Sequence, residues 1–235
     1  MTIDTAMVLA AGLGTRMRPL TETRPKPLIE VGGRALVDHM LDRLADVGVT
    51  KAVVNVHYLA AQMLSHLAGR ERPQIVISDE RARLMETGGA LVQAACELGP
   101  RPIFAVNTDQ VWIEDAGDAF AAMRSAWNPL QMDCLLLLAR RDRTSGFDGA
   151  GDFFRASDGR IARRGSAAQA PYVYAGAQII DPRIFRSFPL EPFSANRLWD
   201  VAASRARLFG VVLDGFWMHV GDPTGLVAAE ERLRR

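Results

Sequence analysis

The chain of 235 residues is long enough for one large or two small domains, and its 49% of apolar residues supply an ordinary core. Its formal net charge of +1 gives no reason to expect nucleic-acid or membrane partners. No apolar run reaches the ~18 residues of a membrane span, and the N-terminal segment 1–5 lacks the basic start of a signal peptide. We therefore expect a cytoplasmic protein with two buried free thiols, Cys96 and Cys134.

The first half of the chain alternates between two kinds of pattern. Apolar runs predict strands over residues 6–11, 28–31, 52–56, 74–78 and 102–106. Helical spacing of apolar residues predicts helices over residues 36–47, 59–67 and 90–98. Strands that alternate with helices indicate an α/β fold, a doubly wound, mixed but mostly parallel sheet with helices on both faces.

The second half is less regular. It predicts helices over residues 115–127, 182–188, 196–205 and 223–234 and strands over residues 134–139, 172–180, 207–213 and 216–220. Residues 146–165, rich in Gly, Asp and Arg, predict a small hairpin that covers a cleft. We expect a single domain, 1–235, in which 146–165 is an appended β lid.

The end of the first predicted strand carries the densest functional signal. Gly12 and Gly14 end the strand, and Arg16, Arg18 and Lys26 follow. Small residues let the backbone approach a ligand, and successive N–H groups there form a cup for phosphate oxygens. The basic side chains add full positive charge. This pattern predicts a triphosphate-binding loop where the first strand ends.

Two other phosphate-binding motifs are excluded. Met17 stands where a dinucleotide fingerprint, G-x-G-x-x-G, needs its third glycine, which argues against an NAD-binding dehydrogenase. No G-K-[ST] sequence occurs, so the loop is not of the Walker A type.

The stretch Leu9–Pro27 fills every position of the pattern L-A-A-G-x-G-T-R-[ML]-x-P-L-T followed by [RK]-P-K-P. It resembles the signature of the sugar-1-phosphate nucleotidyltransferases, and the resemblance extends from Met7 to the last helix. It implies a Rossmann-like, GT-A-like fold and a reaction that joins an NTP to a sugar 1-phosphate and releases pyrophosphate. The nucleotide-binding residues that it implies are Leu9, Ala10, Ala11, Gly12, Gly14, Thr15, Arg16, Lys26, Glu86, Gly88, Gly89 and Asn107.

Catalysis and metal binding follow from the same resemblance. Arg16 and Lys26 would bind the triphosphate, and Asp109 matches the family's metal-binding aspartate, although a helix cap is the alternative role for Asp109. Mg²⁺ is the implied cofactor, because it prefers oxygen ligands and phosphates. The family's second metal-binding aspartate is replaced by His219, whose imidazole suits Mn²⁺ better.

Three arrangements of the metal site remain open. His219 binds the metal directly or through water, Asp222 moves in instead, or Asp109 alone holds Mg²⁺ together with the triphosphate. A further alternative is that His219 is only hydrogen-bonded beside the cleft.

Further segments resemble parts of the family's substrate site. Glu86–Ala90, E-T-G-G-A, matches its base-reading segment, in which an amide of Gly88 or Gly89 can approach a flat base. Glu86 has an alternative role as an acid at a helix N-terminus. The implied sugar-binding residues are Asn107, Asp152, Tyr174 and Gly176, with a turn and a core position as the alternatives for Asp152 and Tyr174.

The short chain and its motifs resemble most the family members that use UTP and an amino-sugar 1-phosphate in cell-wall recycling. A mannose-1-phosphate guanylyltransferase or a phosphocholine cytidylyltransferase would use the same loop. An alternative of another class is a nucleotide-sugar-binding module that has lost catalysis. We expect small-molecule substrates, no nucleic acid, no membrane, and a monomer or weak homo-oligomer.

Overall fold

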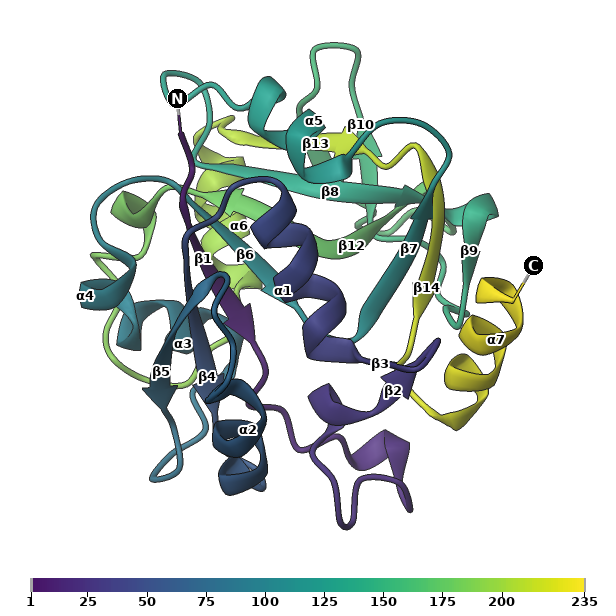
Figure 1. The fold of residues 1–235 in the computed structure, drawn as a ribbon. Helices are drawn as coiled ribbons and strands as arrows, with labels where there is room; N and C mark the ends of the chain where they lie inside the picture. Colours follow the sequence, from purple (N-terminus) through teal and green to yellow (C-terminus); the bar gives the residue numbers. More distant parts are fainter. Residues whose placement is uncertain (1, 235) are drawn as a thin grey trace.

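A computed structural model describes residues 2–234 and has a central sheet with helices on both faces (Figure 1). Four parallel strands, in the order β6-β1-β4-β5, form one half of this sheet. They are β1 (Thr5–Leu9), β4 (Lys51–Val56), β5 (Gln74–Asp79) and β6 (Ile103–Asn107). Their carboxyl ends lie at one edge, which is where ligands bind in folds of this class.

The other half of the sheet is largely antiparallel. β12 (Tyr172–Ile180) runs antiparallel to β6 on one side and to β8 (Cys134–Arg140) on the other, and β13 (Leu208–Val212) lies parallel to β8. The expected hairpin forms from β10 (Phe153–Arg155) and β11 (Ile161–Arg163). It joins β12 and so continues the central sheet at its edge.

Side chains alternate between the two faces of β1. Ala6 and Val8 pack in one core with α1 (Leu36–Asp46), α2 (Ala60–Leu67) and α5 (Ala119–Ala126). Met7 packs in a second core with α3 (Glu86–Gln93), α4 (Ala95–Leu98) and α6 (Asn196–Ser204). Both faces of the strand are covered, which explains its unbroken apolar sequence.

A second, three-stranded sheet stands beside the first (Figure 1). It contains β7 (Gln110–Glu114), β14 (Gly215–His219) and β9 (Thr144–Ser145), and α7 (Pro223–Leu233) packs against it. β7 and β14 are antiparallel, and His219 is paired with Gln110. This pairing brings the end of β14 beside the end of β6, although the two are more than a hundred residues apart in the chain.

Several sequence predictions need correction. β7 was not predicted, and the helix expected over 115–127 begins only at Ala119, because Asp118 accepts the Ala121 N–H and caps it. The helix expected from residue 90 begins at Glu86 and breaks at Ala94, and the one expected over 182–188 is only a 3-10 turn, Pro182–Ile184. The strand expected over 28–31 shortens to β2 (Glu30–Val31), which pairs with β3 (Arg34–Ala35).

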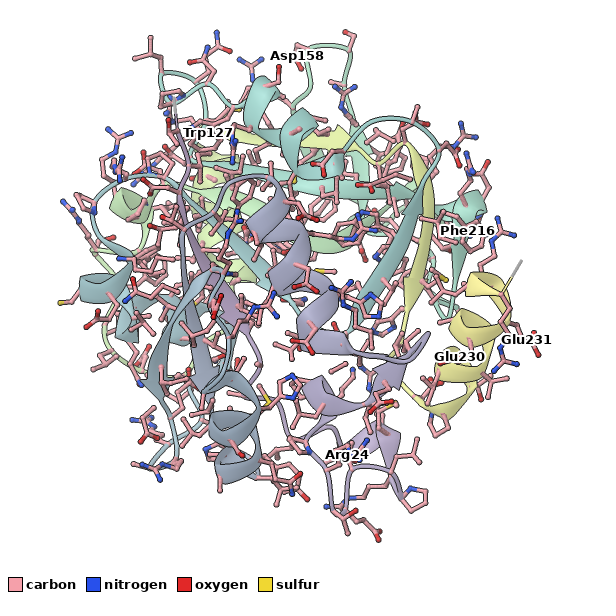
Figure 2. The ribbon with its side chains drawn as sticks, viewed as in Figure 1. Arg24, Trp127, Asp158, Phe216, Glu230 and Glu231 are labelled. Atoms are coloured by element: carbon pink, nitrogen blue, oxygen red, sulfur yellow. The ribbon has the colours of Figure 1, made fainter. Side chains whose placement is uncertain are left out.

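The remaining 3-10 turns are Thr15–Met17, Lys26–Leu28 and Arg141–Arg143. Both cysteines are free, but only Cys134 is buried, so the prediction of a buried thiol is wrong for Cys96, which lies on the exposed face of the short α4. Figure 2 shows Arg24 in the loop between the first two of these turns and Asp158 at the tip of the β10–β11 hairpin. No helix within residues 2–234 has the length and apolar character to cross a membrane.

Candidate active site

The phosphate-binding loop predicted after β1 forms one wall of a cavity of about 320 Å³. Gly14 has a positive φ of 63°, and a Cβ there would lie 3.0 Å from side-chain atoms of Lys26 and Thr21. Thr21 donates to the Gly14 carbonyl at 2.8 Å and holds the turn. Within residues 2–234, the N–H groups of Gly12, Leu13 and Gly14 meet no backbone acceptor, so they are available to an anion.

A buried polar chain connects this loop to the opposite wall of the cavity. The Ala10 N–H donates to Oδ1 of Asn55 at 2.7 Å, and Nδ2 of Asn55 donates to Oε1 of Glu80 at 2.8 Å. The second carboxylate oxygen of Glu80 accepts the Met85 N–H at 3.0 Å. Asn55 and Glu80 are almost fully buried, so these bonds hold the loop and the start of α3 at a set separation.

The wall at α3 differs from the expectation. Leu84, Glu86 and Thr87 line the cavity, whereas Gly88 and Gly89 do not. The expectation that one of the glycine amides faces the base is not met, because both already donate to the Phe193 carbonyl, at 2.8 and 3.1 Å. A Cβ at Gly88 would overlap the Phe193 ring, so these glycines permit close packing behind the cavity wall.

The catalytic residues expected from the sequence come together where β6 ends. Lys26 Nζ donates to Oδ2 of Asp109 at 2.8 Å, and Nε2 of His219 lies 3.5 Å from the same oxygen. Burial raises the pKa of Asp109, but the His219 imidazole and the Lys26 ammonium outweigh it and hold that pKa well below its usual range. Asp109 is therefore a carboxylate at any physiological pH. Arg16 lines the same cavity.

The donors at this point suit a divalent cation held together with phosphates. Oδ1 of Asp109 is buried and has no hydrogen-bond partner among residues 2–234. Nδ1 of His219 lies 3.2 Å from the Gly146 carbonyl, which can only accept, so Nδ1 carries a proton there, and Nε2 on the other side of the ring faces the Asp109 carboxylate. No cluster of three His, Cys, Asp or Glu side chains occurs in the described chain, so the remaining ligands must come from phosphate or water.

Asp222 does not share this role. Its Oδ1 accepts the Gly225 N–H at 2.8 Å and caps α7. Of the three arrangements left open by the sequence, the one in which Asp222 replaces the missing aspartate is therefore disfavoured.

A second cavity of about 510 Å³ adjoins the first, and Leu9, Thr87 and Asn107 line both. Aromatic rings form much of its wall: Tyr174 and Trp199 meet edge to face with centroids 4.7 Å apart. Flat apolar rings of this kind suit the faces of a sugar. Burial raises the pKa of the Tyr174 phenol far above its usual range, so it stays protonated.

Three of the four predicted sugar-binding residues line the second cavity, and Gly176 does not. Asn107, Asp152 and Tyr174 line the second cavity, and Oδ2 of Asp152 accepts the Tyr174 N–H at 2.9 Å. Gly176 does not line it. With φ at 83°, Gly176 leaves space for Gln110, whose Oε1 would lie 2.0 Å from a Cβ at that position.

Sequence reasoning missed several residues of the site. Asn55 could have been found as the one amide in an otherwise apolar strand. Gln110 lines the second cavity from β7, and its buried Oε1 has no hydrogen-bond partner in the described chain. Trp217 lines the same cavity from β14, and the pairing of these two strands was not predicted. Arg164 lines it from the hairpin and had no motif to mark it.

The sequence of this chain matches known nucleotidyltransferases, as the loop, the lysine–aspartate pair and the two cavities would suggest. Residues 5–147, more than half of the chain, match the family model described as nucleotidyl transferase. The chain is 50% identical over 232 residues to an N-acetylmuramate alpha-1-phosphate uridylyltransferase of Caulobacter vibrioides, covering 97% of this chain and 96% of that one.

More distant relatives share the fold over most of their length. A probable mannose-1-phosphate guanylyltransferase of Oryza sativa is 28% identical and is matched over 98% of this chain and 66% of its own. The crystal structure of a UDP-glucose pyrophosphorylase complexed with UDP-glucose superposes with a TM-score of 0.76 at 16% identity, covering 99% of both chains.

If the chain were a catalytically silent module, His219 would be expected to lie far from Asp109, whereas the two side chains lie 3.5 Å apart. The family model matches more than half of the chain, and a relative is 50% identical over 97% of it. This chain therefore belongs to the nucleotidyl transferase family and is a sugar-1-phosphate nucleotidyltransferase.

Proposed function

We propose that this enzyme joins UTP to N-acetylmuramate α-1-phosphate and releases pyrophosphate, a reaction of cell-wall recycling. The supporting observation is that the two cavities share a wall at Asn107, and that Asp109, paired with Lys26 in the first cavity, lies 3.5 Å from His219 of the second. The choice of base and sugar rests on the 50% identity to the Caulobacter uridylyltransferase. Such a reaction uses nucleotides of the cytoplasm, so we place the protein there.

The chemistry needs little acid–base catalysis. The second pKa of a sugar phosphate is about 6, by analogy with phosphoserine, so the phosphate is largely a dianion at neutral pH. It can attack the α-phosphorus of the NTP without a base from the protein. The chain's contribution is to position both phosphates and to stabilise the charge that develops.

Three groups of this chain supply that stabilisation. The free amides of the loop bind the triphosphate, and Arg16 adds its guanidinium. Lys26, held beside Asp109, stabilises charge that develops at the α-phosphorus. Mg²⁺, or Mn²⁺, held by Asp109 and His219 would neutralise further phosphate charge.

The proposal is tested by offering the enzyme each of UTP, GTP, CTP and ATP with N-acetylmuramate, N-acetylglucosamine or mannose 1-phosphate and Mg²⁺. We expect pyrophosphate release to be fastest with UTP and N-acetylmuramate 1-phosphate. A preference for GTP and mannose 1-phosphate would instead favour the guanylyltransferase function of the Oryza relative. The same purified protein, run on a sizing column, tests our expectation of a monomer or weak homo-oligomer.

The metal role of His219 is tested by His219→Asp. An oxygen ligand suits Mg²⁺ better than imidazole, so this variant should retain or raise Mg²⁺-supported turnover, whereas His219→Ala should lower it. Binding of Mn²⁺ in the presence of UTP, followed by electron paramagnetic resonance, gives a readout besides activity. Complete loss of activity and of metal binding in His219→Asp would contradict a ligand role.

A further inference from the structure

We infer that Arg164 recognises a carboxylate substituent on the sugar, an inference that rests on the proposed function. N-acetylmuramate differs from N-acetylglucosamine by a lactyl ether that ends in a carboxylate. An enzyme that selects the former needs a cation inside its sugar cavity. Arg164 is half-buried in the lining of the second cavity, immediately after β11.

Arg164 is held rigidly but its charge is not neutralised. Its Nε donates to the Gly151 carbonyl at 3.0 Å and its Nη1 to the Ala167 carbonyl at 2.7 Å. Its own N–H donates to the carbonyl of Asp152 at 2.7 Å. Among residues 2–234, no carboxylate forms an ion pair with it and Nη2 meets no acceptor. Such a preorganised guanidinium is suited to bind a carboxylate.

The other charged groups in the lining are already engaged. Arg163 is paired with Asp200 at 2.8 Å and also donates to Asn196. Oδ2 of Asp152 accepts the Tyr174 N–H. His219 lies beside Asp109 at the junction with the nucleotide cavity. Arg164 is therefore the one cation in this lining without an anionic or metal-site partner in the described chain.

The position along the sheet fits the length of a hexose phosphate. Ala177 on β12 pairs with Val106, directly before Asn107 at the reaction centre. Tyr174, whose backbone N–H donates to Asp152, lies three residues before Ala177 and therefore about 10 Å farther along the strand. Arg164 is bonded to this Gly151–Asp152 corner. A sugar whose phosphate lies at the junction would thus point its distal substituents toward Arg164.

The test compares wild type with Arg164→Gln on three substrates with UTP: N-acetylmuramate 1-phosphate, the same compound with its lactyl carboxylate converted to a carboxamide, and N-acetylglucosamine 1-phosphate. We expect wild type to lose about 10- to 100-fold in kcat/KM when the carboxylate becomes a carboxamide, as for a charge-assisted hydrogen bond. Arg164→Gln should show about the same loss with the acid, little difference between acid and amide, and a much smaller loss with N-acetylglucosamine 1-phosphate, which has no carboxylate.

Arg160→Gln is the matched control, because it removes the same charge from the same hairpin at an exposed residue paired with Asp158. It should leave all three substrates unaffected. If Arg164→Gln lowers kcat/KM equally for all three substrates, Arg164 only supports the fold and the inference is overturned. If wild type does not use N-acetylmuramate 1-phosphate at all, the proposed function fails and the inference fails with it. Turnover by wild type without acid–amide discrimination refutes Arg164 recognition alone.

Discussion

Lys26 and Asp109 form an ion pair that is only slightly exposed, at 12% and 24% of their side-chain surfaces. Taking two charges out of water is unfavourable unless further contacts satisfy them. Here Oδ1 of Asp109 stays unpartnered within the described chain, and Gly12 and Gly14, whose amides meet no backbone acceptor there, line the same cavity. A pair that is incomplete by itself is suited to bind a cation and a phosphate, which complete it.

We predict that Lys26→Ala lowers kcat about 10²- to 10³-fold, as expected for removing one charge-stabilising donor. The variant should still fold, but its melting temperature should fall, because the largely buried Asp109 carboxylate loses its ammonium partner. Pyrophosphate release under saturating substrates measures the effect. Lys51→Ala removes the chain's other lysine, which donates to the Glu97 carbonyl far from the site, and serves as the control. Near-normal kcat in Lys26→Ala would remove Lys26 from the mechanism.

At the scale of elements, the site depends on how β1, β4 and the start of α3 are held together. Asn55 on β4 and Glu80 after β5 connect the Ala10 amide to the Met85 amide through buried hydrogen bonds. Burial raises the pKa of Glu80, against the lowering effect of its two hydrogen-bond donors. A buried network of this kind sets the width of the first cavity only while every member is satisfied.

Replacing Asn55 by Leu tests this connection. The change leaves the Ala10 amide and one Glu80 oxygen without partners, so the free energy of unfolding should fall by about 1–3 kcal/mol. The KM for the NTP should rise more than the KM for the sugar phosphate, which initial rates with each substrate varied in turn will show. Gln74→Leu, at the exposed start of the neighbouring β5, should change neither. Loss of stability with an unaltered KM for the NTP would make the connection purely structural.

At the scale of the whole molecule, Glu114 joins parts that are distant in sequence. Its carboxylate accepts from Arg43 on α1 at 2.6 Å, from Trp112 Nε1 at 3.1 Å and from the Ala119 N–H at the start of α5 at 2.8 Å. Burial raises the pKa of Glu114, but the Ala119 N–H and Arg43 outweigh this and leave it below its usual value of 4.5. The second sheet is thereby fixed to the first helix and to α5.

The pH dependence of stability follows from that shift. A carboxyl whose pKa is lower in the folded than in the unfolded protein stabilises the fold above the unfolded pKa, and this contribution is lost as the pH falls through the folded pKa. Glu114→Gln should therefore reduce the free energy of unfolding by about 1–3 kcal/mol at pH 7 and by progressively less below pH 4.5. Urea denaturation across this range measures it, with the exposed Glu97→Gln as control. An equal loss at every pH would show that charge is not involved.

The sequence by itself determined the features that depend on local pattern. The apolar run of β1, the glycines that follow it and the lysine between two prolines lie within one short stretch, so the family could be identified and a phosphate-binding loop predicted there. The largely apolar sequence of β12 and the spacing in α1 placed those elements correctly. Local propensity and short-range geometry suffice for such features.

Only the tertiary structure decided how distant segments meet. The β7–β14 pairing puts His219 beside Asp109, and parallel strands align Asn55 with Ala10 and Glu80. The β10–β11 hairpin, by joining β12, places Arg164 in the lining of the second cavity. Which strands pair depends on the burial of side chains across the whole molecule, so it cannot be predicted from a short stretch of sequence. The chemistry of each side chain was therefore readable in the sequence, whereas its neighbours were set by long-range pairing.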